Sequence, residues 1–222
     1  MLWYVYQGVA KARSIDGVWV LTDSEEVFEV AASWGAHTVM TSEYCPSGTA
    51  RIASVIDQID ADIIVNVQGD EPLMTGAVVD QLVGAFDGSG FDVVTPVYRI
   101  TSKEDLENTN INKVVRAADG RALYFSHSTI PFVRDHAPET WLSHVPYWGH
   151  VGVYAYRRQV LEGYASLPGG RLEDVEKLEQ LRFLEAGISI LTVETDYQPR
   201  GVDVPAELEE VKKILDPTSF LR

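Results

Sequence analysis

Two acidic residues stand at the end of a strongly apolar segment. Asp70 and Glu71 follow the run Ile63 to Gln68, separated from it by Gly69. Such a run is typical of a strand buried on both faces, and ligands of these sheets bind at the C-terminal strand ends. A carboxylate there can bridge a hard divalent cation to ligand phosphates, and Gly69 lets the backbone approach closely. Asp70 is therefore a candidate metal ligand, although both acids could simply cap the next turn.

A more distant carboxylate could join it. Asp203 lies between an apolar run at 188–195 and an amphipathic segment at 205–215. If both apolar runs belong to one sheet, Asp70 and Asp203 converge on one Mg²⁺, which keeps water and phosphate oxygens as further ligands. The alternative is that Asp203 only caps the last helix.

Two further groups of polar residues could bind a ligand. Residues 47–49 are a Ser-Gly-Thr turn into a helix, and its exposed N–H groups could hold a ring or a phosphate, with Arg51 nearby. His150 and Tyr154 are four residues apart in a predicted strand and therefore share a face. A lone histidine in a strand is, however, usually a structural residue.

Strands and helices alternate through the first hundred residues. Short apolar or β-branched runs predict strands, and apolar residues at steps of three and four predict helices. The predicted strands are 17–22, 37–40, 62–68 and 91–97, and the helices between them are 24–35, 47–59 and 75–86. This alternation predicts an α/β fold with a mostly parallel central sheet and helices on both faces.

Beyond residue 110 the pattern changes to an antiparallel extension. Residues 112–126 predict two strands around an Asp119-Gly120 turn, and residues 148–156 predict one aromatic strand. Leucine and valine at steps of three predict a single helix over 172–187. Glu179 and Gln180 lie on this helix, where a solvated face is the default interpretation.

The composition excludes several classes of protein. A chain of 222 residues, 45% apolar and 23% charged, has room for one core, and we expect a single domain spanning 1–222. A net charge of −15 repels a phosphate backbone and argues against a nucleic acid polymer as partner. The single cysteine, Cys45, excludes an intramolecular disulfide, and no apolar run reaches the roughly 18 residues of a membrane span. We therefore expect a cytoplasmic protein without membrane insertion.

Six ordered segments resemble one family of enzymes. They are MTSEYCPSGTARI, IVNVQGDEPL, KVVRAADGRALYFSHSTIPF, YWGHVGVYAY, RLEDVEKLEQLRFLEAG and GVDVPAEL. In these segments, which extend over nearly the whole chain, the sequence resembles the 3-deoxy-manno-octulosonate (Kdo) cytidylyltransferases, or CMP-Kdo synthetases. The resemblance implies a homodimer with a three-layer nucleotidyltransferase fold. It also implies that CTP and Kdo react, with Mg²⁺, to give CMP-Kdo and pyrophosphate for lipopolysaccharide synthesis.

The resemblance also implies roles for individual residues. Asp70 and Asp203 match the metal-binding, catalytic aspartates. The residues that match nucleotide contacts are Ser47, Gly48, Thr49, Arg51, Gln68 and Gly69. The residues that match the sugar-acid pocket are His150, Tyr154, Glu179 and Gln180. His127 occupies a pocket position where the family usually has Arg, so the substrate could be a related ulosonic acid such as an amino-Kdo.

The family pattern begins with a strand and a Gly-rich loop that hold the triphosphate. MLWYVYQ resembles the helix just after that loop, so we expect residues 1–222 to be an N-terminally incomplete domain, inactive or poorly folded without an upstream extension. Two other functions remain open from the residues alone. One is a metal-dependent glycosyltransferase, whose usual two aspartates flanking one residue are not matched by Gly69-Asp70-Glu71. The other is a non-catalytic fragment or subunit.

Overall fold

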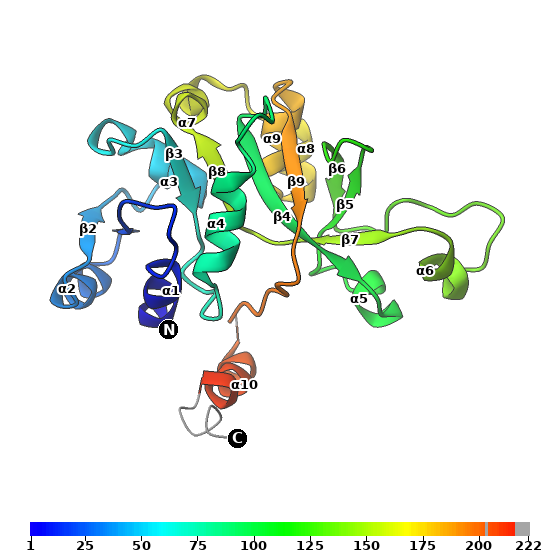
Figure 1. The fold of residues 1–222 in the computed structure, drawn as a ribbon, viewed down its shortest axis with the longest axis horizontal. Coiled ribbons are helices and arrows are strands. Elements are labelled where there is room, and N and C mark those ends of the chain that lie inside the picture. Colours follow the sequence, from blue (N-terminus) through cyan, green and yellow to red (C-terminus); the bar gives the residue numbers. More distant parts are fainter. Residues whose placement is uncertain (203, 216–222) are drawn as a thin grey trace.

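A computed structural model describes residues 1–202 and 204–215 (Figure 1). The strands are β1 (Trp19–Thr22), β2 (His37–Met40), β3 (Ile63–Asn66), β4 (Val93–Ile100), β5 (Lys113–Arg116), β6 (Ala122–Ser126), β7 (Tyr147–His150), β8 (Tyr154–Arg157) and β9 (Ile190–Glu194). The α-helices are α1 (Leu2–Val9), α2 (Glu25–Ser33), α3 (Gly48–Ala53), α4 (Gly76–Gly84), α5 (Lys103–Glu107), α6 (Trp141–His144), α7 (Arg158–Gly163), α8 (Arg171–Glu176), α9 (Gln180–Glu185) and α10 (Pro205–Leu215). Single 3₁₀ turns occupy Ile56–Gln58, Pro138–Thr140 and Tyr164–Ser166.

The strands form two sheets. β1 and β2 pair in parallel and form the small sheet. The larger sheet has the strand order β3-β8-β4-β7-β5-β6. Its seventh strand, β9, pairs in parallel with β4, along the edge of β4 opposite β8. β8 lies antiparallel between β3 and β4, so β3, β4 and β9 run in the same direction. The predicted α/β fold is confirmed. Its sheet is more mixed than the expected mostly parallel one, because β8 runs antiparallel between β3 and β4.

Helices cover both faces of the larger sheet. On one face α3, α7 and α9 supply Ile52, Leu161 and Phe183 to a core around Tyr156. On the other face α4 packs against β3, β4 and β8, and α1 packs against α4. β4 contributes alternate residues to the two cores and is buried along most of its length. This strand is therefore buried on both faces, whereas β3, for which the run at 63–68 predicted the same, alternates between half-buried and buried residues.

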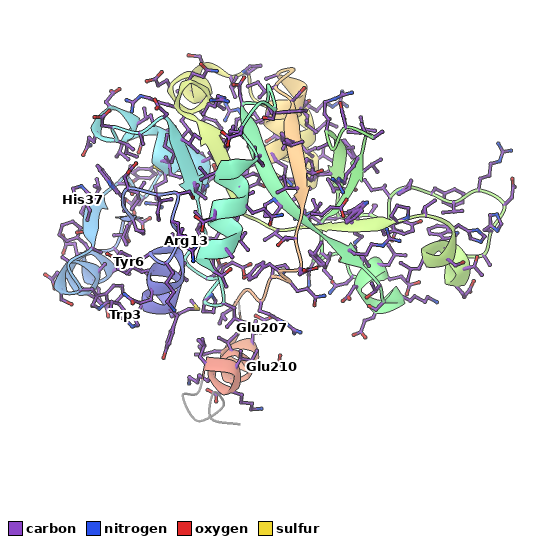
Figure 2. The ribbon with its side chains drawn as sticks, in the orientation of Figure 1. Trp3, Tyr6, Arg13, His37, Glu207 and Glu210 are labelled. Atoms are coloured by element: carbon purple, nitrogen blue, oxygen red, sulfur yellow. The ribbon has the colours of Figure 1, made fainter. Side chains whose placement is uncertain are left out.

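The small sheet is attached through aromatic residues. Trp3 and Tyr6 project from α1 toward α2 (Figure 2), where the Trp3 ring meets the Trp34 ring edge-on at 5.0 Å between centroids. α2 is capped by Ser24, whose Oγ accepts a hydrogen bond from Val27 N. In the part of the chain that the structure describes, no helix is long and apolar enough to cross a membrane.

Two predicted elements are each divided. Residues 148–156 form the end of β7 and the start of β8, with a break at 151–153. The predicted helix over 172–187 is two short helices, α8 and α9, because Lys177 adopts a left-handed conformation with φ of 55°. The predicted Asp119-Gly120 turn does form, with Gly120 at φ of 85°.

Candidate active site

The turn before α3 is held against the end of β3. Ser47 Oγ accepts from Ala50 N at 3.1 Å and so caps the helix. Gly48 lies over polar side chains: a Cβ at this position would be 2.8 Å from Gln68 Nε2 and 3.2 Å from Asn66 Nδ2. Gln68 Nε2 in turn donates to Asn66 Oδ1 at 3.4 Å. The absence of a side chain at Gly48 therefore lets the turn lie close to these amides.

The next residue of the turn is anchored in the core. Thr49 is fully buried, and its hydroxyl is 2.8 Å from the hydroxyl of Tyr156. Burial, reinforced by the charge of nearby Glu179, raises the pKa of Tyr156 well above its ordinary value. The phenol therefore stays protonated, and Thr49 contributes a rigid support rather than an accessible ligand group.

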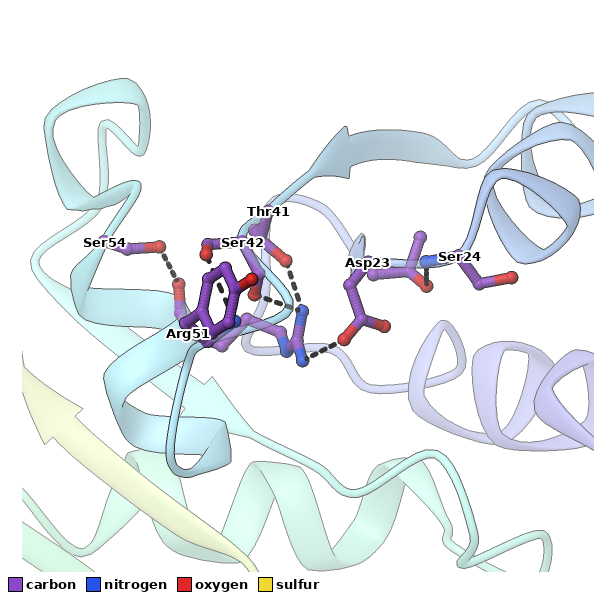
Figure 3. Close-up of polar contacts among 8 residues, drawn as sticks. Asp23, Ser24, Thr41, Ser42, Arg51 and Ser54 are labelled. Carbon is purple, nitrogen blue, oxygen red and sulfur yellow. Dashed lines mark hydrogen bonds and ion pairs between the residues drawn. The ribbon is translucent and has the colours of Figure 1, made fainter.

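The Arg51 side chain binds residues at the ends of the two strands of the small sheet (Figure 3). Its guanidinium forms an ion pair of 3.0 Å with Asp23 and also donates to Thr41 Oγ1. The hydrogen bond from Arg51 is the main cause that lowers the pKa of Asp23. Arg51 thus ties α3 to the ends of β1 and β2, whereas a nucleotide contact was predicted for it; that contact stays a prediction.

His150 is a neutral, oriented side chain. It is 7% exposed, and burial lowers its pKa to about 3. The Thr95 hydroxyl donates to Val153 O at 2.7 Å, so its oxygen accepts from His150 Nε2 at 2.9 Å. This fixes the tautomer with hydrogen on Nε2, and Nδ1 is left as a hydrogen-bond acceptor.

Tyr154 lies at the centre of the predicted sugar pocket. Its ring centroid is 5.3 Å from that of His150, although a break separates the two strands. Its hydroxyl donates to Gln180 Oε1 at 2.9 Å. Asn66 is its partner across β3 and β8, so both side chains point to the same face. The predicted solvated face is wrong for Gln180, which is 2% exposed because the break before α9 turns it inward.

This cluster contains polar atoms without partners. Among the residues the structure describes, four buried side-chain atoms lack a hydrogen bond: Asn66 Nδ2, Asn112 Oδ1, Glu179 Oε2 and Gln180 Nε2. Asn112 lies beside His150, because the backbone carbonyl of Asn112 accepts a hydrogen bond from His150 N at 2.8 Å. Each unsatisfied buried group costs about 1–3 kcal/mol. Two donors and two acceptors around Tyr154 are complementary to hydroxyl groups, which can both donate and accept.

The acidic pair after β3 contacts a distant segment. Glu71 is buried, and its Oε2 accepts from Tyr197 OH at 2.8 Å and from Arg200 N at 3.3 Å. Burial, then the charge of Glu71 and their hydrogen bond, raises the pKa of Tyr197 well above its ordinary value. Tyr197 is therefore the donor in this pair.

Asp70 is joined to the same segment through its backbone. Val202 N donates to Asp70 O at 3.1 Å. Asp203, the other predicted metal ligand, lies outside the described residues, so the meeting of the two aspartates stays a prediction. Gly69 is exposed, and a Cβ there would meet only Leu2 Cδ1 at 3.4 Å. Among the described residues no group of three or more candidate metal ligands gathers.

His127 is held by its neighbours at the end of β6. Its Nδ1 is 2.6 Å from Thr109 O, which can only accept, so Nδ1 carries the hydrogen. Its backbone N donates to Glu176 Oε2 at 3.1 Å. When the ring is neutral, Nε2 is then an acceptor, which suits a hydroxyl or ammonium group better than a carboxylate.

Sequence reasoning missed a buried lysine beside this residue. Lys113 is fully buried, and Nζ donates to the carbonyls of Asn108, Ile111 and His127 at 2.7, 2.8 and 3.0 Å. Desolvation lowers its pKa. Its three hydrogen bonds fix the loop before β5 and the end of β6 around the cluster.

A separate surface hollow lies elsewhere on the molecule. It measures about 730 Å³ and is lined by α4, β4, β7 and residues 194–197, including Gln81, Arg99, Trp148 and Tyr197. None of the predicted site residues lines it. The structure instead brings Thr49, His150, Tyr154, Glu179 and Gln180 together around the end of β3 and adds Asn66 and Asn112, which sequence reasoning missed.

Comparisons with known proteins identify the family of the chain. A family profile described as cytidylyltransferase matches residues 1–190. The 3-deoxy-manno-octulosonate cytidylyltransferase of Acidobacterium capsulatum is 43% identical over 97% of this chain and 85% of its own length. The enzyme of the same name from Thermodesulfovibrio yellowstonii is 38% identical over 97% of this chain and 88% of its own.

Solved structures give the same result. The structure of CMP:2-keto-3-deoxy-manno-octonic acid synthetase complexed with CTP matches with a TM-score of 0.88 and 37% identity, over 96% of this chain and 86% of that one. The 4-diphosphocytidyl-2C-methyl-D-erythritol synthase of Anaerococcus prevotii, at 11% identity and a TM-score of 0.61, shares the fold over 96% of this chain and 85% of that one. The chain therefore belongs to the cytidylyltransferase family of nucleotidyltransferases, and within it to the 3-deoxy-manno-octulosonate cytidylyltransferases.

Proposed function

We propose that the protein transfers CMP from CTP to the anomeric C2 hydroxyl of Kdo, or of a close ulosonic acid, and releases pyrophosphate. The observation that carries this proposal is the buried polar cluster around Tyr154, in a chain whose fold matches that of a relative solved with CTP. A sugar acid has the several hydroxyl groups that such a cluster can accept from and donate to.

In the proposed reaction the C2 hydroxyl oxygen attacks the α-phosphorus of CTP. A new O–P bond forms, the bond from the α-phosphorus to the bridging oxygen breaks, and pyrophosphate leaves with that electron pair while the hydroxyl proton passes to solvent. Transfer of this kind depends mainly on alignment and charge stabilisation. The turn at 47–49 and Gln68 would hold the nucleotide. His150, Tyr154 and Gln180 would hold the sugar beside it.

His150 fits a role in orientation. Because burial keeps the ring neutral, it cannot neutralise the carboxylate of a sugar acid. Its Nδ1 can accept a hydrogen bond from a sugar hydroxyl, while Thr95 holds the other nitrogen. We therefore propose that His150 selects and orients the sugar.

We propose Mg²⁺ as the cofactor, held by Asp70 and Asp203. Asp70 follows β3 and supplies hard oxygen donors. The Val202 N–H donates a hydrogen bond to the Asp70 carbonyl, so residues up to 202 run beside Asp70. In nucleotide sites Mg²⁺ takes one or two carboxylates and completes its coordination shell with phosphate oxygens and water. The carboxylate of Asp70 is a ligand of this kind. When bound, the ion supplies positive charge to the phosphates and to the attacking hydroxyl.

We also propose that the protein is a cytoplasmic homodimer whose product serves lipopolysaccharide synthesis. These statements follow from the family resemblance. Light scattering after gel filtration tests the assembly, and a mass of about one chain would contradict the dimer.

The reaction is tested by incubating the full-length protein with CTP, Kdo and Mg²⁺ and following pyrophosphate with a coupled assay. We expect release that requires both substrates and is lost in Asp70→Asn. UTP and ATP, and a sugar without a 2-keto acid, are the controls. Pyrophosphate release that does not require a sugar acid, or no release with any ulosonic acid, would contradict the proposal.

A further inference from the structure

One buried carboxylate joins two parts of the chain that are far apart in the sequence. Glu71 Oε2 binds the Tyr197 hydroxyl and the Arg200 amide, partners that are 126 and 129 residues away. Gly201 also lies against it, since a Cβ there would be 3.8 Å from Glu71 Oε1. The segment 197–202 is therefore organised around this side chain.

The same segment reaches the neighbouring residue. The Val202 N–H binds the Asp70 carbonyl, so the chain just before Asp203 runs beside Asp70. A buried carboxylate is expensive to desolvate unless it is hydrogen-bonded, and the hydrogen bonds from Tyr197 and Arg200 come from the returning segment. Glu71 thus anchors residues 197–202.

We propose that Glu71 is a positioning residue, whose carboxylate anchors residues 197–202 and, through the Val202 N–H that binds the Asp70 carbonyl, holds Asp70 in place as a ligand of the divalent cation. This rests on the proposed function, because it takes Asp70 as a ligand of the ion. Glu71 acts through Tyr197 and Arg200 and does not itself bind the ion. Residues that orient metal ligands commonly change metal affinity by about 10–100-fold when replaced.

Three substitutions separate this role from others. Glu71→Ala removes both hydrogen bonds and should release the segment. Glu71→Gln keeps one carbonyl oxygen that can accept from Tyr197 and Arg200, and should largely preserve the segment. Tyr197→Phe removes one bond and should give an intermediate effect.

A matched control lies outside the site. Tyr147→Phe removes a comparable bond, from the Tyr147 hydroxyl to Pro131 O at 2.7 Å. It should lower stability by an amount similar to that of Tyr197→Phe, without affecting the ion. The melting temperature of each variant reports that general effect.

The measurements are Mn²⁺ affinity by electron paramagnetic resonance, with a non-hydrolysable CTP analogue present, and amide hydrogen exchange over residues 197–202. We expect Glu71→Ala to weaken Mn²⁺ binding about 10–100-fold and to speed exchange in this segment. Glu71→Gln should stay within a few-fold of the wild type. The proposal is overturned if Glu71→Ala binds Mn²⁺ normally, if Glu71→Gln fails as completely as Glu71→Ala, or if Tyr147→Phe weakens binding equally.

The same data separate this inference from the proposed function. If the wild type makes no CMP-sugar yet Glu71→Ala still weakens Mn²⁺ binding and loosens 197–202, the activity is wrong and the positioning role stands. If CMP-Kdo forms but Asp70→Asn leaves Mn²⁺ binding unchanged, the ion site and this inference fail while the transferase activity stands.

Discussion

Acidification should destabilise the protein through His150. The ring is buried against Tyr154 and Phe125, its Nε2 already donates to Thr95, and burial lowers its pKa from 6.5 to about 3. A proton added to Nδ1 would place a charge in the core. The unfolded chain binds this proton as the pH falls through 6.5, whereas the folded chain does not do so until about pH 3.

The sign and size follow from this difference. Between those two pH values the unfolded state binds more protons, so stability is lost as the pH falls. The loss is roughly 1.4 kcal/mol per pH unit, which gives roughly 2 kcal/mol at pH 5. Acidic groups titrate in the same range, and a comparison with His150→Gln removes their contribution.

Urea unfolding of both proteins at pH 7 and pH 5 measures the effect. We expect the wild type to lose about 2 kcal/mol more than His150→Gln over this range. His37→Gln, at an exposed position on β2, is the control and should behave like the wild type. An equal loss in the wild type and in His150→Gln would refute the reasoning.

Three further predictions concern Gly48, Lys113 and His127. Gly48→Ala should raise KM for CTP while costing less than about 1 kcal/mol of stability, because the new Cβ meets the movable end of Gln68, 2.8 Å away. Steady-state kinetics and urea unfolding measure the two effects, and an unchanged KM would contradict the prediction. Lys113→Met should cost about 3 kcal/mol or more in urea unfolding, because it leaves three buried carbonyls without their donor; a loss no larger than that of Lys11→Met, an exposed control, contradicts it. His127→Arg should shift the ratio of kcat/KM between Kdo and an amino-Kdo toward Kdo, and an unchanged ratio shows that this position does not select the sugar.

Local patterns predicted most of the elements. The apolar strands β3 and β4 and the Asp119-Gly120 turn formed as expected, because each depends mainly on neighbouring residues. The order of strands did not follow from the same patterns. β8 lies between β3 and β4 through contacts that no short window of sequence contains.

The site was predicted by family resemblance more than by pattern. The leucine spacing continues across Lys177, so it could not reveal the left-handed residue that turns Gln180 into the core. Asn66 did leave a signal, as a polar residue within an apolar strand, and that signal was not used. Glu71 and Tyr197 left none, because their contact depends on where the chain returns after β9.

The most direct test of the central claim is phosphorus nuclear magnetic resonance of the full-length protein with CTP, Kdo and Mg²⁺. We predict that the CTP signals are replaced by equal amounts of a CMP-sugar phosphodiester and pyrophosphate, and that Asp70→Asn prevents this while keeping its melting temperature. Hydrolysis of CTP to CMP without a phosphodiester, or no change in the CTP signals, would contradict the account.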